Sequence, residues 1–129
     1  MQSYQLFINV TKRINLKVGK LGTFKFPVGC YVYTGSAKKN IDNRIKSHFS
    51  KKKNLHLHID YLLNNDDVYI IDIKKSEITE CSLNKKTKGT IIVDGFGSSD
   101  CNLCCKSHLK YKENIALAEL SANALGGYK

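Results

Sequence analysis

A strand that ends in a glycine turn and runs directly into a helix constrains the fold of this chain most strongly. Segment 29–37 reads GCYVYTGSA, in which β-branched and aromatic residues typical of a buried strand precede Gly35. The next stretch, 37–50, has apolar residues every four positions, as one face of a helix: Ile41, Ile45 and Phe49. It also carries Arg44 and His48, so this part of the chain brings a phenol, a guanidinium and an imidazole close together in sequence.

The remaining segments alternate between strand-like and helix-like patterns. Strands are expected at 4–10, 30–33, 68–73 and 91–93, and helices at 37–50, 56–63 and 76–86. Residues 14–26 place apolar side chains among lysines and glycines, as in an exposed hairpin with Gly22 at its turn. This order predicts a small α/β (α+β) fold in which helices flank a central, mainly antiparallel sheet.

The chain has the size of one domain with a single core, at 129 residues. We assign residues 1–111 to that domain and 112–129 to a C-terminal helical extension or tail. No apolar run reaches the ~20 residues that span a bilayer, and the N-terminus lacks a signal-peptide pattern, so we expect a cytoplasmic protein without membrane contact. Its five cysteines are an odd number, which favours thiols or metal ligands over a disulfide framework.

The charge balance is strongly basic. Twenty-one Lys and Arg against eleven Asp and Glu give a net charge of +10, which favours a polyanionic partner, with nucleic acid as the first choice. Lysine runs would contact backbone phosphates without reading bases. We expect such contacts on either side of the helix 37–50, at Lys38, Lys39, Lys52 and Lys53. For any one of these lysines, a solvated surface is the alternative.

Five polar residues are candidates for a catalytic centre. Tyr4 and Tyr33 lie on two of the expected strands. Arg44 and His48 are one helical turn apart, and Glu80 belongs to the first turns of a later helix. The five converge if the strands are neighbours. The alternative for each residue alone is structural: tyrosines packed in the core, a solvated helix face, and a glutamate that stabilises a helix N-terminus.

At these residues the chain resembles the GIY-YIG nuclease superfamily, whose members carry Gly-Ile-Tyr and Tyr-Ile-Gly on their first two strands, followed by a helical arginine and a glutamate. Tyr33-Thr34-Gly35 matches the second motif and Tyr4 the tyrosine of the first. Arg44 and Glu80 match the two later residues. The chain is similar to a mostly archaeal branch of small GIY-YIG-like endonuclease domains, some of them joined to DNA-repair enzymes. The segments that carry this similarity are 31–37, 56–62, 80–81 and 96–101.

The resemblance implies a metal-dependent endonuclease that hydrolyses phosphodiester bonds, of DNA more than RNA, in association with DNA-repair proteins. Glu80 would hold Mg²⁺ or Mn²⁺, and Arg44 would bind a non-bridging phosphate oxygen. Tyr4 would take the proton of the attacking water while Tyr33 positions the water or the phosphate. Because the ordinary pKa of tyrosine is ~10, nearby cations must lower it, and His48, at ~6.5, is the rival base. Further substrate contacts are expected at Gly35, Ser36 and His58.

Two further patterns concern metals. We expect His58 and Asp60 to make polar contacts that fix their helix or touch the substrate, with metal ligation as the alternative. A Cys-x-x-Cys with a nearby His suggests a zinc site, with reduced buried cysteines as the alternative; its residues are Cys101, Cys104, Cys105 and His108. Two other functions therefore stay open, namely a non-catalytic nucleic-acid-binding module on the same scaffold and a zinc-binding structural adaptor.

Overall fold

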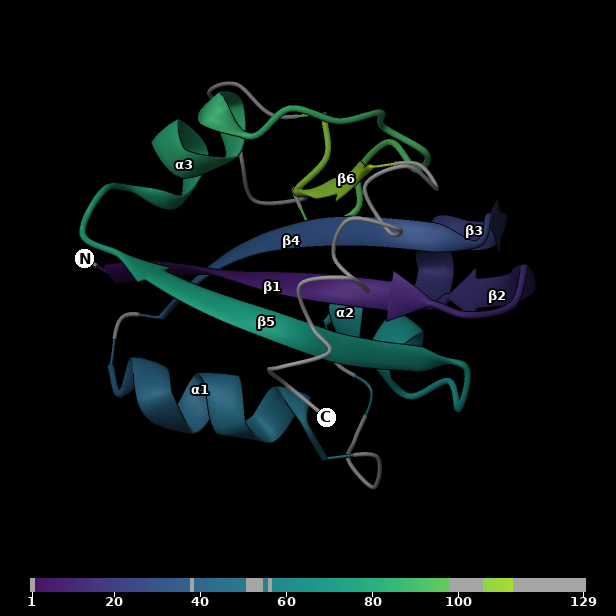
Figure 1. The fold of residues 1–129 in the computed structure, drawn as a ribbon, viewed down its shortest axis with the longest axis horizontal. Coiled ribbons are helices and arrows are strands. Elements are labelled where there is room, and N and C mark those ends of the chain that lie inside the picture. Colours follow the sequence, from purple (N-terminus) through teal and green to yellow (C-terminus); the bar gives the residue numbers. More distant parts are fainter. Residues whose placement is uncertain (1, 38, 51–54, 56, 98–105, 113–129) are drawn as a thin grey trace.

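The computed structural model describes residues 2–37, 39–50, 55, 57–97 and 106–112 (Figure 1). The strands within them are β1 (Gln2–Val10), β2 (Ile14–Val18), β3 (Gly22–Phe26), β4 (Gly29–Ala37), β5 (Val68–Ser76) and β6 (Leu109–Tyr111). The helices are α1 (Ile41–His48), α2 (His58–Leu63) and α3 (Glu80–Lys86), with a 3₁₀ turn η1 (Gly19–Leu21) between β2 and β3. The expected mixed α/β fold is confirmed.

A four-stranded sheet forms the centre of the fold, in the order β5-β1-β4-β6, and every neighbouring pair is antiparallel. Strands β1 and β4 pair along their whole length, which sets Tyr4 opposite Gly35 and Leu6 opposite Tyr33. Strands β2 and β3 form a separate two-stranded hairpin, at the right-hand end of the sheet in Figure 1.

The core lies between one face of this sheet and helices α1 and α2. Alternate residues of β1, beginning with Tyr4 and ending with Val10, are almost completely buried, as the two-residue period of a strand requires. Helix α1 contributes Ile41 and Ile45, and α2 contributes three residues that are at most 2% exposed: Ile59, Leu62 and Leu63.

Helix α3 contacts the side chains of β1 that point to the other face. Ser3 Oγ donates a hydrogen bond to the carbonyl oxygen of Ile78, just before the helix, at 2.6 Å. Gln5 Nε2 donates to Oγ1 of Thr87, just after the helix, at 2.6 Å, and to Oγ1 of Thr34 at 3.2 Å. Both ends of α3 are thereby tied to the central strand.

Several expected element boundaries were wrong. The hairpin turn is η1, and Gly22 begins β3 instead of forming the turn. The expected strand 91–93 is replaced by β6, which pairs with β4, and only Thr90 forms an isolated bridge to Tyr111. Three residues pair in β6, too few for a clear strand pattern in the sequence.

The apolar face of α1 also differs from the expectation. His48 takes the buried position expected for Phe49, which is 52% exposed at the C-cap. Helix α3 begins after the N-cap Thr79, whose Oγ1 accepts from the backbone N–H of Ser82. Ser76, the expected N-cap, instead ends β5 and accepts from the backbone N–H of Ile78.

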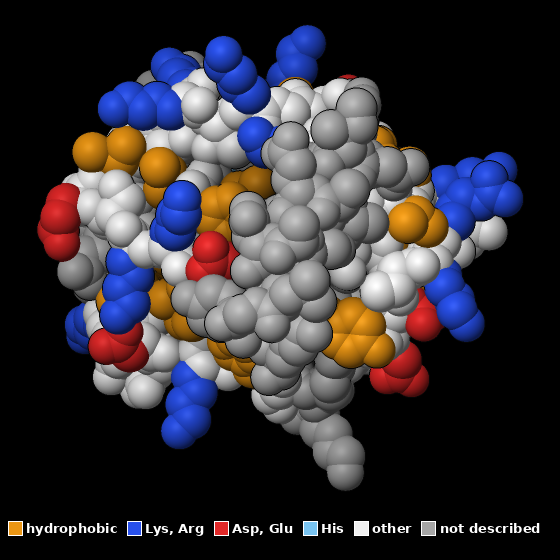
Figure 2. Space-filling view, viewed as in Figure 1, with side chains coloured by type: hydrophobic (Ala, Val, Ile, Leu, Met, Phe, Trp, Pro, Cys, Tyr) orange, Lys and Arg blue, Asp and Glu red, His pale blue; other side chains and the backbone are white. Residues whose placement is uncertain are grey.

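Lys and Arg side chains lie along much of the rim of the face seen in Figure 2, including the end where Figure 1 places β2 and β3, with Asp and Glu side chains between them at the left and lower right. Residues 113–129, assigned above to a C-terminal extension, lie outside the described residues. In the part of the chain that the structure describes, no helix combines the length and the hydropathy needed to cross a bilayer.

Candidate active site

A buried hydrogen bond between β1 and α1 forms the centre of the site. Oη of Tyr4 lies 2.6 Å from Nε2 of His48. Tyr4 is 1% exposed and His48 is 3% exposed. His48 reaches Tyr4 because it follows Ile41 and Ile45 at helical spacing on the buried face of α1. The imidazole thus takes a core position, not the solvated helix face considered for it.

Tyr33 adds a second phenol beside this pair. Its ring centroid lies 6.5 Å from that of Tyr4 and 6.3 Å from that of His48. Gly35 makes this packing possible, because a Cβ at this position would lie 2.7 Å from Cζ and Oη of Tyr4 and 3.0 Å from Cε2 of Tyr33. The Tyr4 phenol therefore packs directly against Gly35, the glycine of the Tyr-Thr-Gly motif, and a side chain at this position would clash with it.

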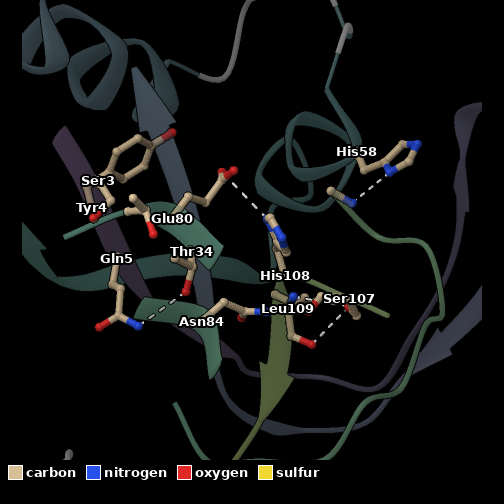
Figure 3. Close-up of polar contacts among 12 residues, drawn as sticks. Ser3, Tyr4, Gln5, Thr34, His58, Glu80, Asn84, Ser107, His108 and Leu109 are labelled. Atoms are coloured by element: carbon tan, nitrogen blue, oxygen red, sulfur yellow. Dashed lines mark hydrogen bonds and ion pairs between the residues drawn. The ribbon is translucent and has the colours of Figure 1, made fainter. Parts of the chain in front are cut away.

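Glu80 begins helix α3, and its carboxylate lies against His108. Oε2 of Glu80 is 3.5 Å from Nδ1 of His108 (Figure 3). The Glu80 side chain keeps 27% of its surface exposed, whereas His108 keeps 1%. His108 directly precedes β6, and its carbonyl oxygen accepts a hydrogen bond from the backbone N–H of Thr34 at 2.9 Å. The imidazole that contacts Glu80 is thus held to β4 through its backbone.

Two further contacts hold α3 against the segment around β6. Nδ2 of Asn84 donates to the carbonyl oxygen of Ser107 at 2.8 Å. Nζ of Lys110 donates to the carbonyl oxygens of Asn84 and Thr87 at the C-terminal end of the helix. Since a helix terminus has carbonyls without partners inside the helix, this lysine satisfies two acceptors and fixes the orientation of α3.

The charges of the candidate site act on both phenols. Burial raises the pKa of Tyr4 and of Tyr33 above the ordinary tyrosine value. Arg44 partly offsets this by lowering both pKa values, whereas Glu80 and Asp60 raise both. The two phenols therefore share the electrostatic environment of one cation and two carboxylates. Both are protonated at neutral pH.

The expected substrate-binding residues differ in their surroundings. His58 accepts a hydrogen bond at Nδ1 from the backbone N–H of Gly97 at 2.9 Å (Figure 3), so this nitrogen fixes a loop. Ser36 is half-buried on β4, and Lys39 is exposed just before α1. Arg44 is exposed on α1. Lys38, Lys52 and Lys53 lie outside the described residues.

Some of the residues considered as metal ligands are described by the structure, and they make other contacts. Asp60 Oδ2 accepts from the backbone N–H of Leu57 at 2.8 Å and so caps α2. Of the zinc candidates, Cys101, Cys104 and Cys105 lie outside the described residues, and His108 contacts Glu80. Among the described residues, no group of three or more His, Cys, Asp and Glu side chains is arranged to hold a metal ion.

The sequence identifies one member of the site, His108, only as a zinc candidate. Asp60 is expected from the sequence to fix its helix or touch the substrate, with metal ligation as the alternative, and the structure shows the helix contact, through the backbone N–H of Leu57. The contact of His108 with Glu80 joins segments with no short-range sequence signal and could not have been predicted.

The chain matches a known protein family. The model of the family described as "Domain of unknown function DUF123" matches residues 3–127. No curated protein and no solved structure matches the chain. The matched range contains the whole sheet from Ser3 onward and every candidate residue described above. The chain therefore belongs to the DUF123 family.

Proposed function

We propose that this chain is a metal-dependent endonuclease of the GIY-YIG type that hydrolyses phosphodiester bonds of nucleic acid, DNA in preference to RNA. The observation that carries the proposal is the hydrogen bond of Tyr4 to His48 beside Tyr33, where the charges of Arg44 and Glu80 act on both phenols. The strongly basic composition supports a polyanionic substrate.

The Tyr4–His48 pair supplies a proton path that does not require a free phenolate. In the neutral His48 tautomer that carries its proton on Nδ1, the Tyr4 hydroxyl donates to Nε2, 2.6 Å away. As a water attacks phosphorus, Tyr4 accepts the proton of the water and passes its own proton to His48, which becomes an imidazolium. The bond from phosphorus to the leaving oxygen breaks, and that oxygen takes a proton from solvent. This relay fits a phenol whose pKa is raised by burial.

Glu80 fits the role of metal ligand. Mg²⁺ and Mn²⁺ take oxygen ligands and are commonly held by one or two carboxylates together with waters and phosphate oxygens. The Glu80 carboxylate is partly exposed, and His108 orients it. When bound, the ion would stabilise the charge that develops on the phosphate, and Arg44 would bind a non-bridging oxygen through its planar guanidinium.

The experiment is a cleavage assay. Plasmid, branched DNA and RNA are incubated with the protein in Mg²⁺, in Mn²⁺ or in chelator, and compared with Glu80→Gln and Arg44→Ala. We expect cleavage that requires the metal ion and is lost in both variants. Cleavage in chelator, or equal cleavage by wild type and Glu80→Gln, would refute the proposal.

A non-catalytic nucleic-acid-binding module is the second candidate. It is favoured by Gln2, which stands where the first motif of the superfamily has glycine, two residues before Tyr4. This candidate predicts binding that weakens with salt, without cleavage of any of the three substrates. A zinc-binding adaptor predicts stoichiometric zinc in the purified protein that is lost in Cys104→Ser.

A further inference from the structure

We propose that the outer face of the β2–β3 hairpin, together with η1 and Tyr61 of α2, is a second surface that binds the phosphate backbone of nucleic acid. This rests on the proposed function only in taking nucleic acid as the substrate. The surface lies away from the phenols and makes no use of them.

The hairpin carries a concentrated positive charge. Residues 11–26 contain five cationic side chains and no acidic one: Lys12, Arg13, Lys17, Lys20 and Lys25. All five are exposed. Among the described residues, none of the five has an ion-pair partner. Acidic residues lie near two parts of the hairpin. Asp94 is exposed in the loop whose Gly95 approaches Leu21, and Asp67 accepts a hydrogen bond at its carbonyl oxygen from the backbone N–H of Thr11, next to Lys12. The proposed surface therefore relies on Lys17, Lys20 and Lys25.

The strand register places the polar side chains on one face. Asn15 pairs with Lys25, and Lys17 pairs with Thr23. All four are exposed, while the alternate residues of β2 and β3 turn inward, with Val18 and Phe26 fully buried. Lys17 and Lys25 are diagonal neighbours, at a separation of about 7–8 Å between their backbones. Two cations at this spacing on an exposed ribbon can each contact a phosphate of the same strand.

A hollow of about 670 Å³ adjoins this face, lined by Lys17, Gly19, Lys20, Gly22 and Tyr61. Gly19 has φ +50°, and a Cβ there would lie 3.2 Å from Oη of Tyr61, so the turn closes on the phenol ring. Two ammonium groups and one aromatic ring suit a phosphate and an adjoining base or sugar.

The hairpin and the candidate active site lie at opposite ends of β1. Tyr4 is near its start, and the chain leaves Val10 to enter β2. At about 3.3 Å per residue, the path from Tyr4 to Val10 spans about 20 Å. Successive base pairs are about 3.4 Å apart, so a nucleic acid that reaches both ends covers about six base pairs. A nucleic acid that contacts both the hairpin and the phenols must therefore be at least about six base pairs long.

The test measures binding in chelator, where no turnover occurs. A fluorescent 20-base-pair DNA duplex is titrated at several salt concentrations with wild type and with Lys17→Gln/Lys25→Gln. The matched control is Lys85→Gln/Lys86→Gln, which removes the same charge from exposed residues of α3. We expect the hairpin variant to reduce the slope of log affinity against log salt by about 2 and the control by less than about 1.

Three outcomes would overturn the hairpin surface. Equal weakening in the two variants would mean that overall charge alone governs binding. Unchanged binding by the hairpin variant would remove the surface even if the wild type cleaves DNA. The hairpin variant could lose binding to anionic phospholipid vesicles or to polyglutamate and still bind the duplex like wild type. That result would mean that the positive charge of the hairpin serves another partner. Conversely, lost duplex binding in a protein that never cleaves would support the hairpin surface and refute the endonuclease.

Discussion

Oη of Tyr4 lies 2.6 Å from Nε2 of His48, across 44 residues of sequence and between two almost completely buried side chains. The buried Tyr4 hydroxyl and the buried Nε2 of His48 satisfy one another in this contact, which offsets the cost of burying these two polar atoms. The same contact gives the phenol a proton acceptor. The same hydrogen bond therefore contributes to the stability of the fold and to the proposed proton transfer. Substitutions must separate these two roles.

Tyr4→Phe should stop cleavage while keeping the fold. The ring retains its packing against Gly35, and the lost hydrogen bond should cost about 1 kcal/mol of folding free energy. Loss of the proton path should lower the single-turnover cleavage rate by about 100-fold or more, with DNA binding unchanged. Tyr69→Phe, at an exposed position of β5, is the matched control. Equal rates in the two variants would remove Tyr4 from the mechanism.

His108 should act by positioning Glu80. Substituting His108→Ala removes the group that lies against the carboxylate, and we expect the Mg²⁺ concentration at half-maximal cleavage to rise about 10-fold or more. His108→Gln retains a polar group and should recover part of the loss. The measurement is cleavage rate against metal concentration, with thermal melting as a control for folding. A lower rate at saturating metal, without a change in the metal requirement, would contradict this role.

Gly35→Ala should destabilise the protein, because the added methyl group would lie 2.7 Å from the Tyr4 phenol and 3.0 Å from Tyr33. Both rings are packed in the core and have little room to move. We expect a loss of about 1–3 kcal/mol in unfolding free energy. Ser36→Ala, the next residue of β4, is the control and should change stability by much less. The measurement is chemical denaturation. Equal midpoints in both variants would show that the Tyr4 and Tyr33 rings move aside for the methyl group without loss of stability, against this prediction.

Alkaline pH should unfold the protein. Burial raises the pKa values of Tyr4, Tyr31 and Tyr33, so the folded chain keeps phenol protons that the unfolded chain loses above about pH 10. Burial also raises the pKa of the Cys30 thiol to about 11. Stability is thus fully present below the unfolded pKa values and falls as pH rises past them, by about 1.4 kcal/mol per pH unit for each phenol.

Thermal melting followed by circular dichroism between pH 7 and pH 11 measures this effect. Phenolate absorbance reports ionisation in the same samples. We expect the absorbance of the buried phenols to rise only with unfolding. A rise that precedes the loss of circular dichroism signal would show that these phenols ionise within the folded protein.

Local patterns predicted much of the architecture. The β-branched and aromatic residues of 4–10 and 30–33 predicted the buried strands β1 and β4, because such side chains favour a pleated, buried surface. The helical spacing of Ile41 and Ile45 predicted α1, because residues four apart lie on the same face of a helix. The positions of Tyr4 and Glu80 on their elements followed from these patterns.

The contacts between elements depended on the tertiary structure. Helical spacing places His48 on the same face of α1 as Ile41 and Ile45, but its partner Tyr4 is decided by the packing of α1 against β1. The short strand β6 exists because β4 offers it a free edge, and its pairing brings His108 to Glu80. Side-chain periodicity is a property of neighbouring residues, and the sequence determines it by itself. Which polar groups meet is decided by strand order and helix docking, because burial of the whole core sets those positions together.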